Sequence, residues 1–141
     1  MMKSAIKEAL NSGKDIPVGA VIVKNGEIIA SSHNEKEVLS DVTAHAEILA
    51  IRKAEQKLGN WRLTDCEMYV TLEPCPMCAW AIIQSGIKAV YFGSYDSNYG
   101  ALGSGIDLCK IANSKLKVYG GIMEEECNKL LDDYFKNMRK S

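Results

Sequence analysis

The sequence has 141 residues, of which 47% are hydrophobic and 25% are charged, as in an ordinary globular protein. A chain of this length corresponds to one domain, and it can bury a core large enough to fold without disulfides. Seventeen Lys and Arg residues nearly balance eighteen Asp and Glu residues, which gives a net charge of -1. This balance excludes a polycation, so any nucleic-acid partner must be bound by a local basic patch.

The apolar runs and the cysteines of the sequence bear on the cellular compartment of the protein. No apolar run approaches the ~20 residues of a membrane-spanning helix. Residues 1–8 lack the apolar stretch of a secretory signal. The chain has five cysteines, an odd number, and two of them are spaced like metal ligands. We therefore expect a reducing, cytoplasmic location.

Hydrophobic periodicity and turn residues predict elements along the whole chain. In the first half they predict a helix over 2–10, strands over 18–23 and 27–30, a loop over 34–42, and a helix over 44–58 capped by Thr43. In the second half they predict strands over 68–72, 87–92 and 116–119, helices over 76–86, 106–112 and 123–138, and a long loop over 95–105.

The order of these elements predicts an α/β fold. Two apolar runs flank Asn25-Gly26, which is a strong signal for an antiparallel hairpin. Helices separate the later strands, which favours parallel pairing between them. A mixed sheet with helices on both faces is the expected architecture.

Two short motifs lie at predicted helix starts, His45-Ala46-Glu47 and Pro74-Cys75-Pro76-Met77-Cys78. Cys75 and Cys78 are three positions apart, so their sulfurs point the same way. One imidazole and two thiolates are suited to zinc, and three protein ligands leave a fourth position open for water, as in catalytic zinc sites.

Glu47 lies two residues after His45, which on a regular helix places it roughly 200° around the axis. Side chains of a first turn can still converge on a metal that sits over the amino end of the helix. Glu47 is then the carboxylate that takes a proton from water. The positive ends of the two helix dipoles favour thiolate at the cysteines.

His-x-Glu followed by Pro-Cys-x-x-Cys is the signature of zinc nucleobase deaminases, the tRNA adenosine deaminases among them. The segments Thr43–Ile48 and Val70–Ala79, and Gly100–Ser104 after Asp96, match further family motifs. The chain thus resembles, over nearly its whole length, the bacterial tRNA-specific adenosine deaminases of the cytidine deaminase-like superfamily.

This resemblance implies a fold, an activity and partners. The fold is a three-layer αβα arrangement with a five-stranded mixed sheet, in a single deaminase domain over residues 1–141. The activity is hydrolysis of the wobble adenosine of a tRNA anticodon to inosine, with release of ammonia. One Zn²⁺ per chain, a tRNA anticodon stem-loop and a homodimer are the implied cofactor and partners.

The resemblance also implies residue roles. His45, Cys75 and Cys78 match the zinc ligands, and Glu47 matches the residue that moves a proton from water to N1 of adenine. The positions that match substrate contacts are Asn34, Ala46, Pro74, Asp96, Phe135 and Arg139, the last two in an aromatic and basic segment that also holds Tyr134 and Lys140.

Two residues depart from the family pattern. Trp80 stands where the family usually has a small residue, which bears on helix or dimer packing. Asn98 stands where we expect a lysine in the loop after Asp96, which removes a phosphate-binding charge.

Other interpretations stay open. A guanine- or cytosine-type deaminase of a free base or nucleoside would share the same four site residues. A closed structural zinc site in a binding module would recruit Cys66 or Cys109 as its fourth ligand. Asn34 is also compatible with an ordinary loop residue, Phe135 with packing, and Arg139 with a solvated helix end.

Overall fold

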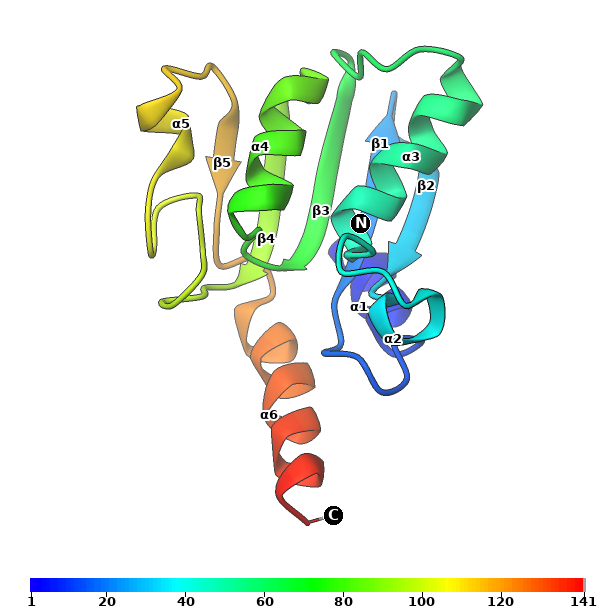
Figure 1. Ribbon diagram of the computed structural model, residues 1–141. Helices are drawn as coiled ribbons and strands as arrows, with labels where there is room; N and C mark the ends of the chain where they lie inside the picture. The colour runs from blue at the N-terminus through cyan, green and yellow to red at the C-terminus, as the bar shows by residue number, and fades with distance from the viewer. Residues whose placement is uncertain (141) are drawn as a thin grey trace.

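The computed structural model describes residues 1–140, apart from the side chain of Lys140. Its centre is a five-stranded sheet of order β2-β1-β3-β4-β5 (Figure 1). The strands are β1 (Gly19–Lys24), β2 (Glu27–His33), β3 (Cys66–Leu72), β4 (Ala89–Ser94) and β5 (Lys117–Tyr119). The helices are α1 (Met2–Ala9), α2 (Lys36–Leu39), α3 (Ala46–Leu58), α4 (Pro76–Ser85), α5 (Leu108–Ile111) and α6 (Glu124–Lys140).

The strand directions confirm the predicted mixed sheet. β1 pairs antiparallel with β2 and β3, whereas β3, β4 and β5 run parallel. At the hairpin, Asn25 and Gly26 both have positive φ, 51° and 77°. A two-residue turn with positive φ at both positions matches the right-handed twist of the flanking strands, which explains the Asn-Gly pair.

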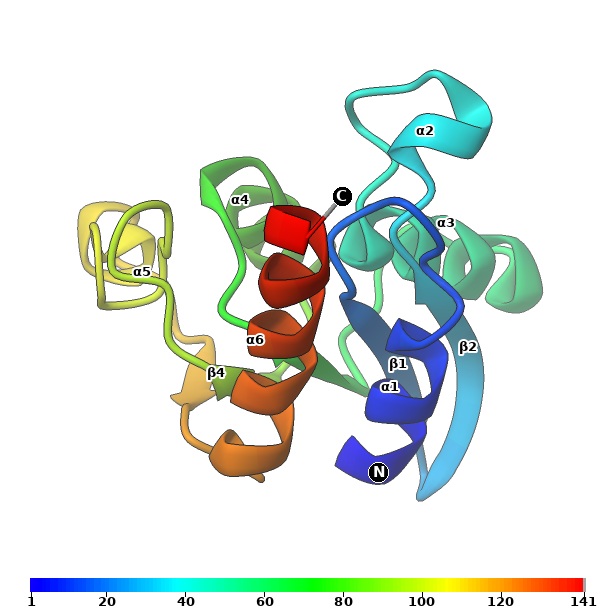
Figure 2. The same ribbon diagram turned by 90° about the horizontal axis from the view of Figure 1, so that it is seen from below.

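Helices cover both faces of the sheet. Alternate residues of β1 point to opposite faces, so Ile22 packs in the larger core with α3 and α4, while Val21 packs against α1 and α6. Figure 2, a view from below, shows α1 and α6 on one side of the sheet and α3 and α4 on the other. The predicted three-layer fold is therefore confirmed.

Two local expectations were wrong. The predicted loop over 34–42 contains α2, which buries none of its residues and so leaves no periodic hydrophobic signal. Thr43 does not cap α3, because its hydroxyl donates to Asp41 Oδ1 at 2.7 Å. His45 is the N-cap of α3 instead, which puts its side chain just outside the helix.

No helix within residues 1–140 has both the length and the hydrophobicity needed to cross a bilayer. All five cysteines are free thiols.

Candidate active site

The amino ends of α3 and α4 form the base of the site. His45 is the N-cap of α3 and Cys75 is the N-cap of α4, both in extended backbone conformation. Pro76 follows at the first position of α4, where its missing N–H leaves no hydrogen bond unmade. Both helices begin at the same end of the sheet (Figure 1), so the two caps face one another.

Three ligand atoms meet at this point. His45 Nδ1 lies 3.5 Å from Cys78 Sγ and 3.8 Å from Cys75 Sγ. All three donor atoms lie within 4.8 Å of one another. Tetrahedral zinc, with bonds of about 2.0 Å to nitrogen and about 2.3 Å to sulfur, separates such donors by about 3.5 Å. The residues present therefore fit a zinc ion.

The alternative of a closed site is not supported. The cluster that the described residues form contains only these three donors, and neither Cys66 nor Cys109 belongs to it. A tetrahedral ion on His45, Cys75 and Cys78 would keep one position for a non-protein ligand, as catalytic zinc sites do.

The pKa values of the two cysteine thiols shift in opposite directions. A hydrogen bond from Cys78 holds the pKa of Cys75 at about 4, well below its usual value. The same bond to Cys75, together with burial, raises the pKa of Cys78. The hydrogen bond to Cys75 also raises the pKa of His45. Thiolate is the form of sulfur that binds metal, and the lowered pKa of Cys75 favours this form at that residue.

Glu47 lies in the first turn of α3 and is only 4% exposed. Burial raises its pKa to about 7, against the opposing effect of a hydrogen bond from its own backbone N–H. A carboxyl group that titrates near neutral pH can both accept and return a proton during one reaction. Glu47 lines the same cavity as His45 and Cys75.

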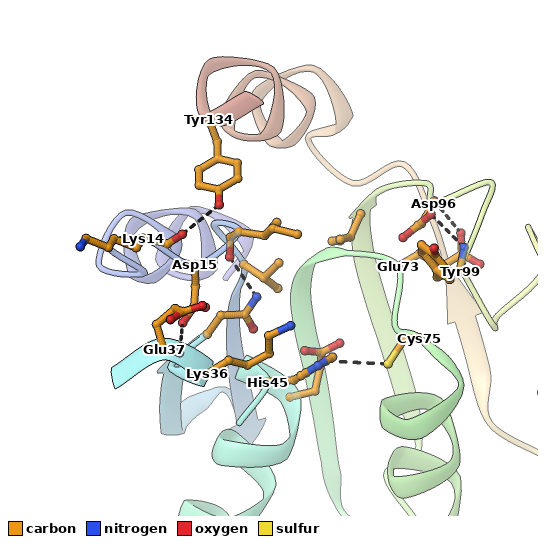
Figure 3. Close-up of a pocket in the computed structure, with 15 residues that line it drawn as sticks. Lys14, Asp15, Lys36, Glu37, His45, Glu73, Cys75, Asp96, Tyr99 and Tyr134 are labelled. Carbon is orange, nitrogen blue, oxygen red and sulfur yellow. Dashed lines mark hydrogen bonds between the residues drawn. The ribbon is translucent and has the colours of Figure 1, made fainter. Parts of the chain in front are cut away.

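A cavity of about 460 Å³ opens over this cluster (Figure 3), a size that suits a small molecule or a single nucleotide. Its walls come from segments far apart in sequence. They are the segment before β1 (Lys14, Asp15, Ile16 and Val18), the segment with α2 (Asn34, Lys36 and Glu37), the end of β3 (Leu72 and Glu73), the loop after β4 (Asp96 and Tyr99) and α6 (Tyr134).

The predicted substrate contacts divide into three groups. Asn34 and Asp96 line the cavity. Ala46 and Pro74 are buried beside it but are not among its lining residues. Phe135 and Arg139 are exposed on α6 outside the cavity, and the side chain of Lys140 lies outside the described residues.

Asn34 also holds the wall together. Its Nδ2 donates to the Ile16 carbonyl at 2.9 Å, and its Oδ1 accepts from the Ala46 amide at 2.8 Å. The side chain thus ties the segment before β1 to the start of α3, which fixes His45 and Glu47 relative to that segment.

Sequence reasoning missed the part that Glu73 plays. Its buried carboxylate accepts backbone hydrogen bonds from Asp96 at Oε1 and from Leu102 and Ser104 at Oε2, each 3.1 Å long. Gly100 packs directly against it, since a Cβ there would lie 2.4 Å from Glu73 Cδ. Two features of the sequence could have indicated this role. Glu73 stands between the end of a strand and Pro74, and a glycine-rich loop, with Gly100, Gly103 and Gly105, follows the next strand.

Other lining residues carried no motif. Tyr134 points its hydroxyl to the Lys14 carbonyl at 2.8 Å, which joins α6 to the cavity wall (Figure 3). Lys36 and Glu37 belong to α2, the helix that the sequence did not predict.

Comparison with known proteins agrees with this geometry. Residues 1–94 match the profile of the cytidine and deoxycytidylate deaminase zinc-binding region. A tRNA-specific adenosine deaminase from Bacillus subtilis (strain 168) is 45% identical over 99% of this chain and 89% of that protein. A structure from a study of A-to-I editing by tRNA:A34 deaminases has a TM-score of 0.89 and 42% identity, over 92% of this chain and 97% of that one.

A guanine deaminase from Bacillus subtilis is also similar. It has 39% identity and a TM-score of 0.65, over 81% of this chain and 69% of that one. The fold and the site thus define a zinc-binding deaminase. The chain belongs to the cytidine and deoxycytidylate deaminase family and, within it, to the tRNA-specific adenosine deaminases.

Proposed function

We propose that this chain is a zinc-dependent hydrolase that converts adenosine to inosine at the wobble position of a tRNA anticodon and releases ammonia. One Zn²⁺ per chain is held by His45, Cys75 and Cys78. The observation that supports this most is the cluster of three donor atoms next to Glu47, at the base of a cavity of nucleotide size.

The reaction replaces the 6-amino group of adenine by oxygen from water. Zinc, when bound, supplies a Lewis acid that lowers the pKa of water toward ~7. Glu47 takes a proton from the attacking water and delivers it to N1 of the adenine ring while C6 accepts the oxygen. Glu47 then takes the remaining proton from the new C6 hydroxyl and passes it to the amino group. The C6–N bond breaks, ammonia leaves, and the C6 oxygen becomes the carbonyl of inosine.

The adenosine enters the cavity as an unstacked base. Asn34 and Asp96 contact the nucleotide from opposite walls, and Ala46 and Pro74 shape the closed end. Phe135 and Arg139 contact the anticodon loop outside the cavity. An anticodon loop presents its bases already splayed, so little unstacking energy opposes entry.

We further propose that residues 1–141 form one deaminase domain that acts as a cytoplasmic homodimer. The exposed face of α4 supports an interface with a second copy. Met77 and Trp80 are 37% and 46% exposed there, although large apolar side chains gain most when they are buried.

Ammonia release tests the activity directly. The zinc-loaded protein is given a tRNA with adenosine at the wobble position, the same tRNA with guanosine there, and free guanine, cytosine and adenosine. We expect ammonia from the first substrate alone. Release from free guanine or cytosine, with none from the tRNA, would establish the alternative, a deaminase of free bases. The similarity to a guanine deaminase is the reason to include these substrates. Metal binding without release from any substrate would favour a binding module.

A further inference from the structure

Lys36 is the cation that reaches into the cavity. It belongs to α2, the exposed helix between β2 and α3, and it lines the cavity over the ligand cluster. Figure 3 shows its side chain extending toward His45, whereas the side chain of Lys14, the other lysine of the wall, extends away. The ammonium group of Lys36 is therefore the positive charge that a bound nucleotide meets.

Lys36 has no internal partner to neutralise it. Within residues 1–140, its ammonium group makes neither an ion pair within 4.0 Å nor a hydrogen bond. Two aspartates of the cavity wall accept backbone amides instead of pairing with Lys36. Asp15 accepts the Glu37 amide at 3.2 Å, and Asp96 accepts the amides of Asn98 and Tyr99, both at 3.0 Å.

A nucleotide bound in this cavity would bring its negative charge near Lys36, which lines the wall. If adenine binds against Glu47 at the closed end of the cavity, the ribose and its phosphates lie nearer the mouth of the cavity, which α2 borders. A phosphodiester oxygen and a lysine ammonium form a strong, charge-assisted hydrogen bond. The loop after β4 offers no such charge, because Asn98 is neutral and exposed.

We propose that Lys36 binds a phosphodiester group next to the target adenosine of the RNA. This inference rests on the proposed function and adds to it the residue that recognises the backbone. Recognition comes from α2, across the cavity from the loop after β4. The contact holds the extruded nucleotide by its charged backbone, so it is independent of the neighbouring bases.

Binding of an anticodon stem-loop RNA tests this inference. The Glu47→Ala background prevents turnover, and fluorescence anisotropy gives affinity as a function of salt. Lys36→Gln should weaken binding about tenfold at low salt, since a charge-assisted bond is lost. The slope of log affinity against log salt should fall by about 0.7, the contribution of one phosphate contact on a single strand. Lys36→Arg should keep most of the affinity.

Lys57→Gln is the matched control, because Lys57 is an exposed lysine in the last turn of α3. It should change neither the affinity nor the slope.

Stem-loops with one neutral methylphosphonate on either side of the adenosine complete the test. At one of these two positions, Lys36→Gln should cost no further affinity. Equal losses on every RNA, or a Lys36→Gln variant that behaves like Lys57→Gln, would overturn the inference. Failure of the proposed function looks different, since the unsubstituted protein would then release no ammonia from the stem-loop.

Discussion

At the residue scale, Glu47 combines two properties that rarely coincide. It is buried, yet it lies beside sulfur and imidazole groups that can hold a cation. Burial disfavours the charged carboxylate, whereas a nearby cation favours it. This opposition allows the protonated and ionised forms to lie close in free energy, as proton transfer in both directions requires.

The first prediction concerns this carboxylate. Glu47→Gln should retain zinc, because the three donor atoms are unchanged, and should lower the deamination rate by about 10²–10⁴-fold, the usual contribution of a general acid–base group. Zinc content and ammonia release on the same preparation measure both effects. Glu55→Gln, in a later turn of α3, is the control. A Glu47→Gln enzyme with near-native turnover would remove Glu47 from the mechanism.

The second prediction concerns the sulfur ligands. Cys75→Ser and Cys78→Ser should each lose zinc, because a serine hydroxyl does not ionise as a thiol does and binds zinc weakly. Cys109→Ser should keep it, since Cys109 lies outside the cluster. Metal analysis after dialysis against a weak chelator gives the answer. Full zinc occupancy in either of the first two variants would contradict the ligand assignment.

The sequence could predict these residues because their signal is local. Two helix starts with His-x-Glu and Pro-Cys-x-x-Cys determine which side chains face outward from the caps. The contact between Asn34 and the Ala46 amide could not be predicted in this way. It depends on how β2 leads into the next segment, and an asparagine in a loop has many equivalent partners.

At the scale of elements, the loop after β4 is organised around one carboxylate. Residues 96–104 contain few hydrophobic side chains that could fix them, but three of their amides converge on Glu73. A carboxylate that accepts several backbone hydrogen bonds determines the path of the chain around it. Asp96 owes its place on the cavity wall to this arrangement.

The third prediction follows from it. Glu73→Gln replaces one accepting oxygen by an amide donor, which leaves one or more backbone N–H groups unpaired and lowers the free energy of unfolding by about 1–3 kcal/mol. Urea denaturation measures the loss, and hydrogen exchange should quicken at whichever of the Asp96, Leu102 and Ser104 amides loses its acceptor. Glu67→Gln is the control, because a glutamine there can still accept the Tyr91 hydroxyl. Unchanged exchange in the loop would show that other contacts hold it.

Elements with a buried face were predictable, and elements without one were not. β1 is an almost continuous buried run and α3 buries one helical face, so both leave a clear hydrophobic signal in the sequence. α2 buries none, and its four residues are too few for a helix to be stable alone. The start of α3 was misplaced because Thr43 has a local partner in Asp41 that competes with capping.

At the scale of the whole molecule, α4 presents apolar side chains to solvent on the face away from the sheet. Trp80 and Met77 lie on its exposed side, close in sequence to the zinc ligands. An interface on this helix would therefore bring a second copy near the mouth of the cavity. The family resemblance predicts a homodimer, and we propose this exposed face of α4 as its interface.

The fourth prediction tests that interface. Trp80→Glu should convert the dimer to a monomer, because burying an unpaired carboxylate at an apolar contact costs several kcal/mol. Light scattering after size-exclusion chromatography gives the mass. Trp61→Glu is the control, since Trp61 is an exposed tryptophan in the segment after α3. A monomeric unsubstituted protein, or a Trp80→Glu variant that still dimerises, would contradict the proposed interface.

Trp61 and Trp80, the only two tryptophans in the chain, are 56% and 46% exposed. An indole in water emits at longer wavelengths than one in an apolar core, so the emission of the isolated chain should shift little on denaturation. Self-association over α4 should instead move the Trp80 emission toward the blue as protein concentration rises. Tryptophan fluorescence would then report the oligomeric state of this protein rather than its folding.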